Sequence, residues 1–329
     1  MSLRVRIAAS PSEIDAVFRL RHRVFGEEGY MDTRPDGRIF DQFDAYPGTA
    51  NIVAVVADTV IGSVRYMQPT DAGCSVEEFF DPRPLAPPGA RLAIGSLLVV
   101  DPAYRGLPGV TFNLTAMGFY WAASQGLTHI VGVVNPERET GFARSGFRRL
   151  GPVIHSDRIR RTPVQPMIAD LESLTDRFAS FLRRHSAPHW LHAFEREFHG
   201  AGDVVIGPDK PRSAAYVVIS GRAAQHDRRG RAIGYLAPGD VFGELAALIN
   251  CPCTSTVRAQ TDLDLMVLER DALRAQLREN HPAAEKMTEL LANRLALSLL
   301  DNDAPGSPDT DRKPSPQKAK LHLVAPTPR

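Results

Sequence analysis

Residues 236–245 read LAPGDVFGEL, and they carry the clearest indication of how the last third of the chain folds. Pro238-Gly239 is a turn signal, and a short strand with a glycine at its end follows at 241–243. Outward from this point, short strands alternate with turns, which is typical of a small all-β barrel or roll. The strands expected in this region are 203–206, 214–219, 222–226, 231–236, 241–243, 255–259 and 263–268.

A long helical stretch follows the strands, at about residues 270–300. It is interrupted at His281-Pro282, because proline favours a helix start and disfavours helix in the residue before it. The apolar helix 282–300 suggests a homodimer formed by helix pairing. Residues 301–329 are rich in Pro, Ser, Asp and Lys, which predicts a disordered tail.

The segments YVVISG (216–221) and LAPGDVFGEL (236–245) resemble the cyclic nucleotide-binding domain family, over about residues 196–300. The resemblance implies an eight-stranded β-roll followed by helices that move when a ligand binds. It also implies a phosphate-binding cassette that begins with Phe-Gly-Glu, with backbone N–H groups facing the phosphate. The nucleotide-binding residues implied here are Gly243, Glu244, Leu245, Cys253 and Thr254.

Cys253 stands where the resemblance places the arginine that neutralises the cyclic phosphate. Losing one side of a desolvated charge pair typically costs about 2–5 kcal/mol. Three interpretations therefore stay open for the roll: regulation by cAMP or another cyclic nucleotide, a degenerate roll used for dimerisation or another ligand, and a redox sensor at Cys251 and Cys253. Arg258 follows nearby in sequence, but the sequence does not show that it replaces the arginine.

The first half of the chain alternates helical and extended patterns. A helix is expected over 12–25 and strands over 51–57, 60–67, 91–100 and 128–134. A further helix is expected over about 110–125, a short helix within 140–150 that stops at Gly146, and a helical segment over 170–199. Residues 69–90 read as a long loop. The succession of strand, turn, helix and strand from residue 91 predicts an α/β (α+β) domain with a mixed or parallel sheet.

Three groups of residues in this half resemble the GNAT acyltransferase superfamily. They are LRHRVF with EE and DQFD (20–25, 27–28, 41–44), GSVR (62–65), and the stretch from Leu97 to Gly109 with SGFRRLGP (145–152). Within the superfamily they look like the long-chain branch, which contains acyl-homoserine lactone synthases and N-acyl amino acid or ornithine acyltransferases. The domains expected are a GNAT-like domain over 1–169, a helical linker over 170–195, the nucleotide-type roll over 196–300 and the tail over 301–329.

The resemblance implies a donor site at the turn between the strand 91–100 and the helix after it. An anion binds well at a helix N-terminus that glycines leave accessible. The turn runs from Arg105 to Thr111, one residue out of register with the GNAT spacing, and Pro108 removes one N–H donor. The donor-binding residues implied are Leu98, Val100, Arg105, Gly106, Gly109 and Thr111.

The implied acceptor site is a polar set of Asp41 and Asp44 with Arg23 and Arg65. The catalytic residues implied are Glu28, Asp41, Asp44 and Arg65: Asp44 and Arg65 shape the acceptor pocket, and Glu28 or Asp41 acts as base or anchors the amine. The alternative is that the arginines and aspartates only tie the N-terminal helix to the sheet.

Three residues typical of these families are absent. The strand supplies neither the glutamate nor the arginine of the autoinducer synthases, and Phe142 stands where many GNAT enzymes carry a tyrosine as general acid. Phe79-Phe80 and residues 85–92 fit either an acyl channel or a core.

The composition excludes several classes of protein. A formal net charge of +1 provides no overall attraction to nucleic acid or to an anionic membrane. We expect no membrane span, no secretory signal and no nucleic-acid partner. Three cysteines without framework spacing indicate reduced thiols and a cytoplasmic protein, and no metal site is expected.

The sequence thus predicts an N-acyltransferase that moves an acyl group from acyl-CoA or acyl carrier protein to a small amine or amino acid. The roll is its regulatory or degenerate second domain. Two other functions remain open. One is a cAMP-regulated protein lysine acetyltransferase, although such proteins carry the two domains in the opposite order. The other is a non-catalytic ligand sensor.

Overall fold

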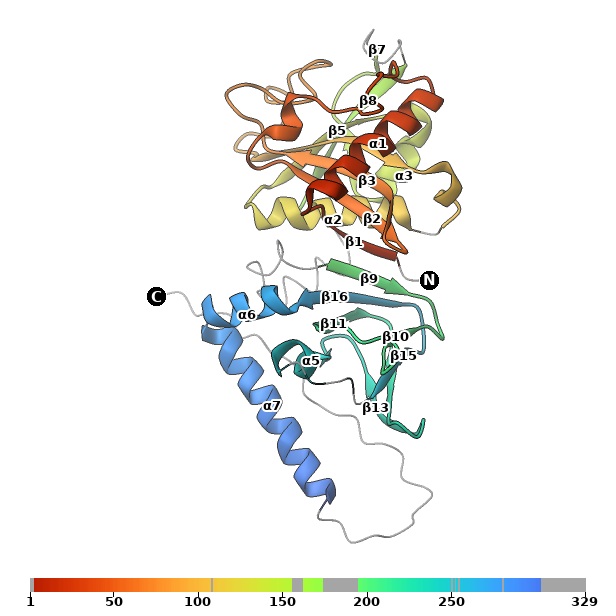
Figure 1. Ribbon diagram of the computed structural model, residues 1–329. Coiled ribbons are helices and arrows are strands. Elements are labelled where there is room, and N and C mark those ends of the chain that lie inside the picture. The colour runs from red at the N-terminus through yellow and green to blue at the C-terminus, as the bar shows by residue number, and fades with distance from the viewer. Residues whose placement is uncertain are drawn as a thin grey trace. The chain divides into compact units, whose positions relative to one another are not determined.

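The computed structural model describes residues 3–107, 109–155, 162–173, 195–249, 251, 253, 255–279 and 281–302. The chain forms two compact units, one over Leu3–Ala179 and the other beginning at Ser180 (Figure 1). The boundary falls inside 174–194, outside the described residues, and so do most of the linker expected over 170–195 and the tail expected over 301–329. Those domain bounds stay predictions.

The N-terminal unit is built on a mixed sheet, with strand order β1-β2-β3-β4-β5-β8-β6 and β7 beside β8. β4 and β5 are parallel and their neighbours are antiparallel, which confirms the predicted α/β architecture. The strands are β1 (Leu3–Ile7), β2 (Ala50–Val56), β3 (Thr59–Met67), β4 (Leu92–Val100), β5 (His129–Val134), β6 (Phe147–Arg149), β7 (Ile154–His155) and β8 (Pro163–Asp170). The helices are α1 (Pro11–Glu27), α2 (Val110–Ser124) and α3 (Glu139–Arg144), with 3-10 turns η1 (Gln42–Ala45), η2 (Pro102–Tyr104) and η3 (Pro136–Arg138).

The helix α1 begins at a capping box, in which Ser10 and Glu13 bond to each other's backbone N–H groups. Its apolar stripe packs on one face of the sheet, where Leu20 and Val24 meet Val99 of β4. Figure 1 shows α1 running across this face in front of β3.

The helix α2 packs on the opposite face of the sheet. It is apolar nearly all round, as expected for a buried helix. Its close approach depends on glycine, because a Cβ on Gly118 would lie 2.1 Å from the ring of Tyr66. The helix that follows β4 is thereby fixed against β3.

The long loop over 68–91 covers a second apolar cluster on the α1 face. Met67, Ile94 and Val131 of the sheet pack there with Cys74 and Val76 of the loop. Phe80, Ala86 and Ala90 lie against the same cluster. Of the stretch that the sequence left open between acyl channel and core, these three residues thus pack on a core, whereas Leu85 is 49% exposed.

The C-terminal unit contains two four-stranded antiparallel sheets among its described residues, with orders β14-β11-β16-β9 and β10-β15-β12-β13. The strands are β9 (Glu195–His199), β10 (Val204–Ile206), β11 (Ala214–Ser220), β12 (Ala223–His226), β13 (Ala232–Leu236), β14 (Val241–Phe242), β15 (Thr256–Ala259) and β16 (Leu263–Glu269). The helices are α5 (Glu244–Ile249), α6 (Arg270–Glu279) and α7 (His281–Asn302). This is the expected β-roll, with the expected helix break before Pro282.

One expectation was wrong in part. The helical segment predicted over 170–199 ends in a strand, since β9 pairs with β16 from Glu195 to His199. Arg196 is buried in this strand, and its ion pair with Asp264 compensates the buried charge. Residues 174–194 lie outside the described residues.

Candidate functional site

The parallel strands β4 and β5 separate halfway along their length. They pair from Leu92 with His129 to Gly95 with Gly132, and the pairing within these fully described strands stops there. β4 nevertheless continues to Val100, and β5 continues to Val134 beside β8. The sheet therefore opens on the side of the carboxyl ends of these two strands, where α/β sheets commonly bind ligands.

A bulge in β4 lies at the same point. Arg65 of β3 pairs with Ser96 and Ser63 pairs with Val99, so two residues of β4 stand against one residue of β3. Leu97 has φ 52°, a left-handed conformation that is rare for a leucine. Bulges and such backbone strain cluster at functional sites. The predicted donor-facing residues Leu98 and Val100 both lie beyond the last pair with β5.

The predicted donor cradle forms the N-terminus of α2. Gly109 is the N-cap with φ 81°, and no side chain caps the helix. Thr111 lies in its first turn and is exposed, as is Gly106. Pro108 lies outside the described residues.

Arg105 and Glu28 meet beside this turn. They form an ion pair, and Arg105 Nε donates to the carbonyl of Val100 at 3.1 Å. Glu28 is the C-cap of α1. The structure thus places Glu28 next to the predicted cradle, paired with Arg105 and not with the two aspartates.

Asp41 and Asp44 converge on Arg65. Arg65 Nη1 donates to Asp41 Oδ1 at 2.6 Å and to Asp44 Oδ2 at 2.9 Å, and its Nη2 donates to Asp41 Oδ2 at 2.9 Å. The side chains of Arg65 and Asp44 are 1% and 4% exposed, whereas that of Asp41 is 43% exposed. Asp41 is therefore the carboxylate of this pair that a ligand can reach.

The second arginine of the set is Arg21, and the expectation of Arg23 was wrong. Arg21 Nη1 donates to Asp44 Oδ1 at 3.0 Å, and Arg21 Nη2 donates to Asn51 Oδ1. Arg23 pairs with Asp101. The sequence could have identified Arg21, because this residue falls among the apolar residues of the helix face that packs on the sheet.

Asp44 is unsuited to act as a base. Burial raises the pKa of its carboxyl, but the guanidinium groups of Arg21 and Arg65 outweigh that effect and hold the pKa below its ordinary value. Both of its oxygens already accept hydrogen bonds from these arginines. Asp44 therefore positions the two arginines.

Two serines that the sequence did not single out connect this cluster to the bulge. Arg65 Nε donates to Ser96 Oγ at 3.1 Å, and Ser96 Oγ lies 3.2 Å from Ser75 Oγ. Ser96 directly follows Gly95, the last β4 residue paired with β5. No motif identified the two serines, because their roles depend on the register of the sheet.

Phe142 offers no acid group, as the sequence indicated. Its ring packs edge-on against Phe147, with the centroids 5.6 Å apart.

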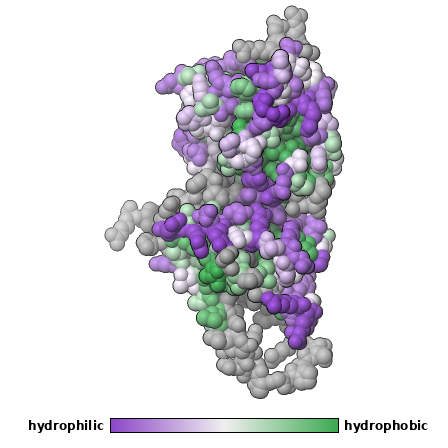
Figure 2. Space-filling model, viewed as in Figure 1, coloured by the Kyte–Doolittle hydropathy of each residue, from purple (hydrophilic) through white to green (hydrophobic). Residues whose placement is uncertain are grey.

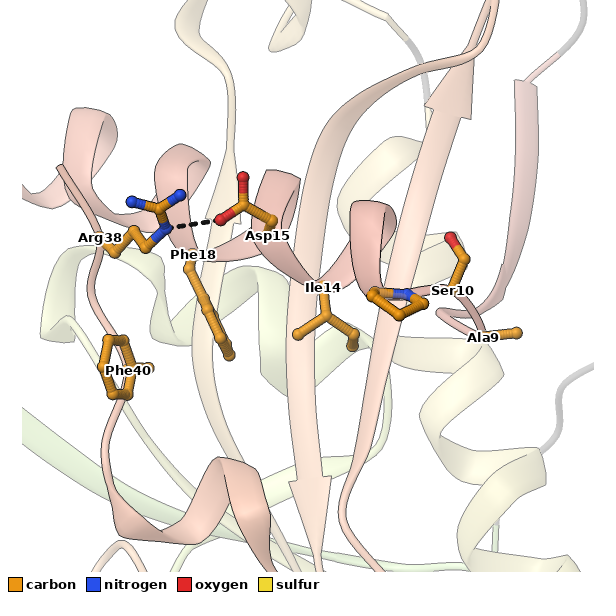
Figure 3. A pocket seen from close by; sticks show the side chains of 8 residues that line it. Ala9, Ser10, Ile14, Asp15, Phe18, Arg38 and Phe40 are labelled. Carbon is orange, nitrogen blue, oxygen red and sulfur yellow. Dashed lines mark hydrogen bonds and ion pairs between the residues drawn. The ribbon is translucent and has the colours of Figure 1, made fainter. Parts of the chain in front are cut away.

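A hollow of about 500 Å³ lies along the start of α1 and contains none of the predicted site residues. Figure 3 shows Ile14, Phe18 and Phe40 lining it, with Asp15 and Arg38 paired at the rim. The rings of Phe18 and Phe40 are in contact, with centroids 5.3 Å apart. Since Asp15 and Arg38 pair with each other, we assign no chemistry to this hollow.

The front of the predicted nucleotide cassette forms a glycine turn and a short helix. Gly243 has φ 76°, and a Cβ there would come within 2.7 Å of the carbonyl oxygen of Ala214, so the position requires glycine. Glu244 is the first residue of α5 and is 2% exposed. Leu245 and Ile249 are 46% and 69% exposed, and Figure 2 shows apolar surface over α5.

The back of the cassette is apolar where the family carries its arginine. Cys253 packs against the core of the roll, and burial raises the pKa of its thiol, so it stays neutral. Arg258 is exposed and donates to the carbonyl of Gly202 at 2.6 Å, so it does not supply the missing buried cation. Thr254 lies outside the described residues.

None of the helices in the described part of the chain has the length and apolarity needed to span a bilayer. Within the same residues, no group of three or more His, Cys, Asp and Glu side chains is arranged to hold a metal ion.

Family models match both units. Residues 16–170 match the N-acyl amino acid synthase FeeM, and residues 196–280 match the cyclic nucleotide-binding domain. Among solved structures, FeeM from uncultured soil microbes is 16% identical with a TM-score of 0.46, over 53% of this chain and 93% of that one. The acyl-homoserine lactone synthase BjaI is 20% identical with a TM-score of 0.44, over 51% of this chain and 83% of that one.

Curated relatives match the C-terminal part. A cGMP-dependent protein kinase of Caenorhabditis elegans is 34% identical over 102 residues, which are 31% of this chain and 13% of the kinase. A CRP-like cAMP-activated transcriptional regulator of Mycobacterium tuberculosis is 29% identical over 115 residues, which are 32% of this chain and 51% of the regulator. The chain thus spans about half or less of the length of these relatives. By its family matches, it carries an N-acyl amino acid synthase FeeM-type GNAT domain followed by a C-terminal cyclic nucleotide-binding-type domain.

Proposed function

We propose that the N-terminal unit transfers an acyl group from a thioester of coenzyme A or acyl carrier protein to the amine of an amino acid or another small amine. The observation that carries this proposal is the opening of the sheet after Gly95 and Gly132, directly before the uncapped start of α2. A thioester whose anionic arm lies at a helix N-terminus can present its carbonyl to such an opening.

The reaction needs one bond made and one broken. The amine nitrogen attacks the thioester carbonyl, a C–N bond forms, and the C–S bond breaks as the thiol leaves. One proton must leave the amine, and one must reach the sulfur. Backbone N–H groups at the bulge around Leu98 are suited to stabilise the oxyanion of the intermediate.

Asp41 is our choice for the acceptor side. It is the exposed carboxylate of the arginine–aspartate cluster, and Arg65 fixes it with two hydrogen bonds. An ammonium group binds well to such a carboxylate, which can also take up the amine proton through water. Glu28 stays paired with Arg105 beside the cradle and has no acceptor role in this proposal.

The experiment is a matrix of acyl-CoA and acyl carrier protein donors of several chain lengths against a set of amino acids, with products weighed by mass spectrometry. The proposal predicts an N-acyl amino acid. Acetylation of a peptide lysine would favour the lysine acetyltransferase, and a lack of turnover with every donor would favour the non-catalytic sensor. Asp41→Asn should abolish product while the protein stays folded.

We further propose that the roll does not bind cyclic nucleotides with the affinity usual for its family. The supporting observation is that the neutral Cys253 packs on an apolar core where the phosphate cation is needed. Burial of an anionic phosphate without a counter-charge is strongly unfavourable. Titration of the full chain with cAMP and cGMP tests this, and saturation at micromolar nucleotide would contradict it.

A further inference from the structure

The C-terminus of α1 is capped in a way that fixes the position of Tyr30. The cap residue is Glu28, and Gly29 after it has φ 73°. The N–H of Gly29 donates to the carbonyl of Gly26 at 3.1 Å. The N–H of Tyr30 donates to the carbonyl of Phe25 at 2.9 Å, and the two rings meet edge-on with centroids 6.3 Å apart. Together these contacts form a Schellman motif, so Tyr30 has a defined place after the helix.

The segment that ends α1 reaches both strand ends at the opening of the sheet. On one side, Glu28 pairs with Arg105, and Arg105 Nε donates to the carbonyl of Val100, the last residue of β4. On the other side, the Tyr30 hydroxyl accepts a hydrogen bond of 3.3 Å from Nδ2 of Asn135, which directly follows β5. Since the opening lies between the carboxyl ends of β4 and β5, Tyr30 lies at its mouth.

The hydrogen bond with Asn135 leaves the hydrogen of the Tyr30 hydroxyl available. Asn135 caps the turn η3, and its Oδ1 accepts from the N–H of Glu137 at 2.9 Å. A backbone N–H can only donate, so this bond fixes the amide with Nδ2 toward Tyr30. Nδ2 can also only donate, and the phenol oxygen is therefore the acceptor. Among the described residues, no group accepts the hydrogen of this phenol.

The proposed transfer develops negative charge close to this hydroxyl. When the C–S bond of the tetrahedral intermediate breaks, its electron pair goes to the sulfur, and a proton donated there favours the departure of the thiol. Phe142 cannot donate one, because its ring carries no acid group and packs against Phe147. Tyr30 carries a hydroxyl at the opening where the thioester carbonyl is proposed to lie.

We propose that Tyr30 is the general acid of this reaction and donates its hydroxyl proton to the sulfur as the C–S bond breaks, with Asn135 as its positioning residue. The proposal rests on the proposed acyltransferase function and adds a catalytic residue to it. The tyrosinate then takes up a proton from the solvent, which receives the proton that the amine releases. Each turnover therefore moves one proton from nitrogen to sulfur and leaves the tyrosine unchanged.

The test measures kcat and KM of the full chain with an acyl-CoA or acyl carrier protein donor and an amine that the wild type converts. Tyr30→Phe keeps the ring against Phe25 and removes only the hydroxyl. It should lower kcat by about tenfold or more and change KM for either substrate by less than about twofold. Tyr46→Phe is the matched control, because it removes a hydroxyl from a ring of the same unit that packs edge-on against Phe43, and it should change neither constant.

Asn135→Asp separates the acid role from a structural one. Aspartate caps a helical turn as well as asparagine does, and Tyr30 can donate to its carboxylate, so the cap and the ring both stay in place. The phenol hydrogen is then engaged, and kcat should fall as it does in Tyr30→Phe. A purely structural tyrosine predicts wild-type kcat in Asn135→Asp. The double variant should lose no more than Tyr30→Phe alone, because both changes act on the same proton.

The outcomes separate this inference from the acyltransferase proposal. Wild-type kcat in Tyr30→Phe overturns the inference and leaves the acyltransferase intact. A raised KM for the amine at unchanged kcat also overturns it, because Tyr30 would then bind the acceptor. A further loss in the double variant would contradict the positioning role of Asn135. If the wild type converts no thioester, the acyltransferase and the acid role fail together.

Discussion

Replacing Asp44 with alanine should destabilise the N-terminal unit far more than the same change at Asp41. Asp41 is the N-cap of η1 and Asp44 lies within it, and both accept hydrogen bonds from Arg65. They differ in burial, because the Asp44 side chain is 4% exposed and that of Asp41 is 43% exposed. The pair therefore isolates the effect of a buried counter-charge.

The magnitude follows from what each change leaves behind. Without Asp44, Arg21 loses the carboxylate that compensates its buried charge, and its side chain is 0% exposed. Removing one partner of a buried ion pair costs about 3–5 kcal/mol. Without Asp41, Arg65 still has Asp44, and the loss of an exposed pair plus an N-cap costs about 1–2 kcal/mol.

Urea unfolding measures the difference. The chain has two tryptophans, and Trp121 is 6% exposed in the N-terminal unit. A Trp190→Phe background lets Trp121 report alone. With a urea slope of about 2 kcal/mol per molar, Asp44→Ala should lower the midpoint by roughly 1.5–2.5 M and Asp41→Ala by less than about 1 M. Equal shifts for the two variants would refute the buried-pair argument.

The remaining predictions concern packing, ligand choice and pH. Gly118→Ala should destabilise the unit by about 1–3 kcal/mol because its Cβ would overlap the ring of Tyr66, whereas Gly106→Ala, with nothing within 4 Å, should leave the melting temperature unchanged. Cys253→Arg should strengthen cAMP or cGMP binding by at least about 30-fold in a titration, and no gain would show that the cassette lacks more than its arginine. Since the pKa of Asp44 is held below 3.8, its stabilisation is complete above that value and is lost as pH falls through the lower folded pKa. When the urea midpoint is measured as a function of pH, it should therefore fall less steeply below pH 4 for Asp44→Ala than for wild type.

Elements with a clear hydrophobic period were predicted closely from the sequence. The strand expected over 91–100 is Leu92–Val100, and the helix expected over 110–125 is Val110–Ser124. The strand β9 was missed because it reads EREFH, which lacks apolar alternation. Its charged residues are buried through partners far along the chain. Arg212 Nη1, for example, donates to Glu197 Oε2 at 2.5 Å. The sequence of β9 alone does not predict that pair.

The sequence predicted most of the residues of the candidate site, but it did not predict all of the pairs that they form. Asp41, Asp44 and Arg65 do meet, but the choice between Arg21 and Arg23 depends on which face of α1 lies on the sheet. The apolar neighbours of Arg21 pointed to the buried face, although a buried arginine is uncommon. Ser96 could not be found, because its contact with Arg65 follows from a bulge in β4 that shifts the register.

The most direct test of the acyltransferase account is the stoichiometry of thiol release against amine acylation by the purified full-length chain. The account predicts that free thiol appears only when an amine acceptor is present, with one N-acyl product formed for each thiol. Thiol release without acceptor, at a rate that added amine does not change, would make the protein a thioester hydrolase and contradict the account.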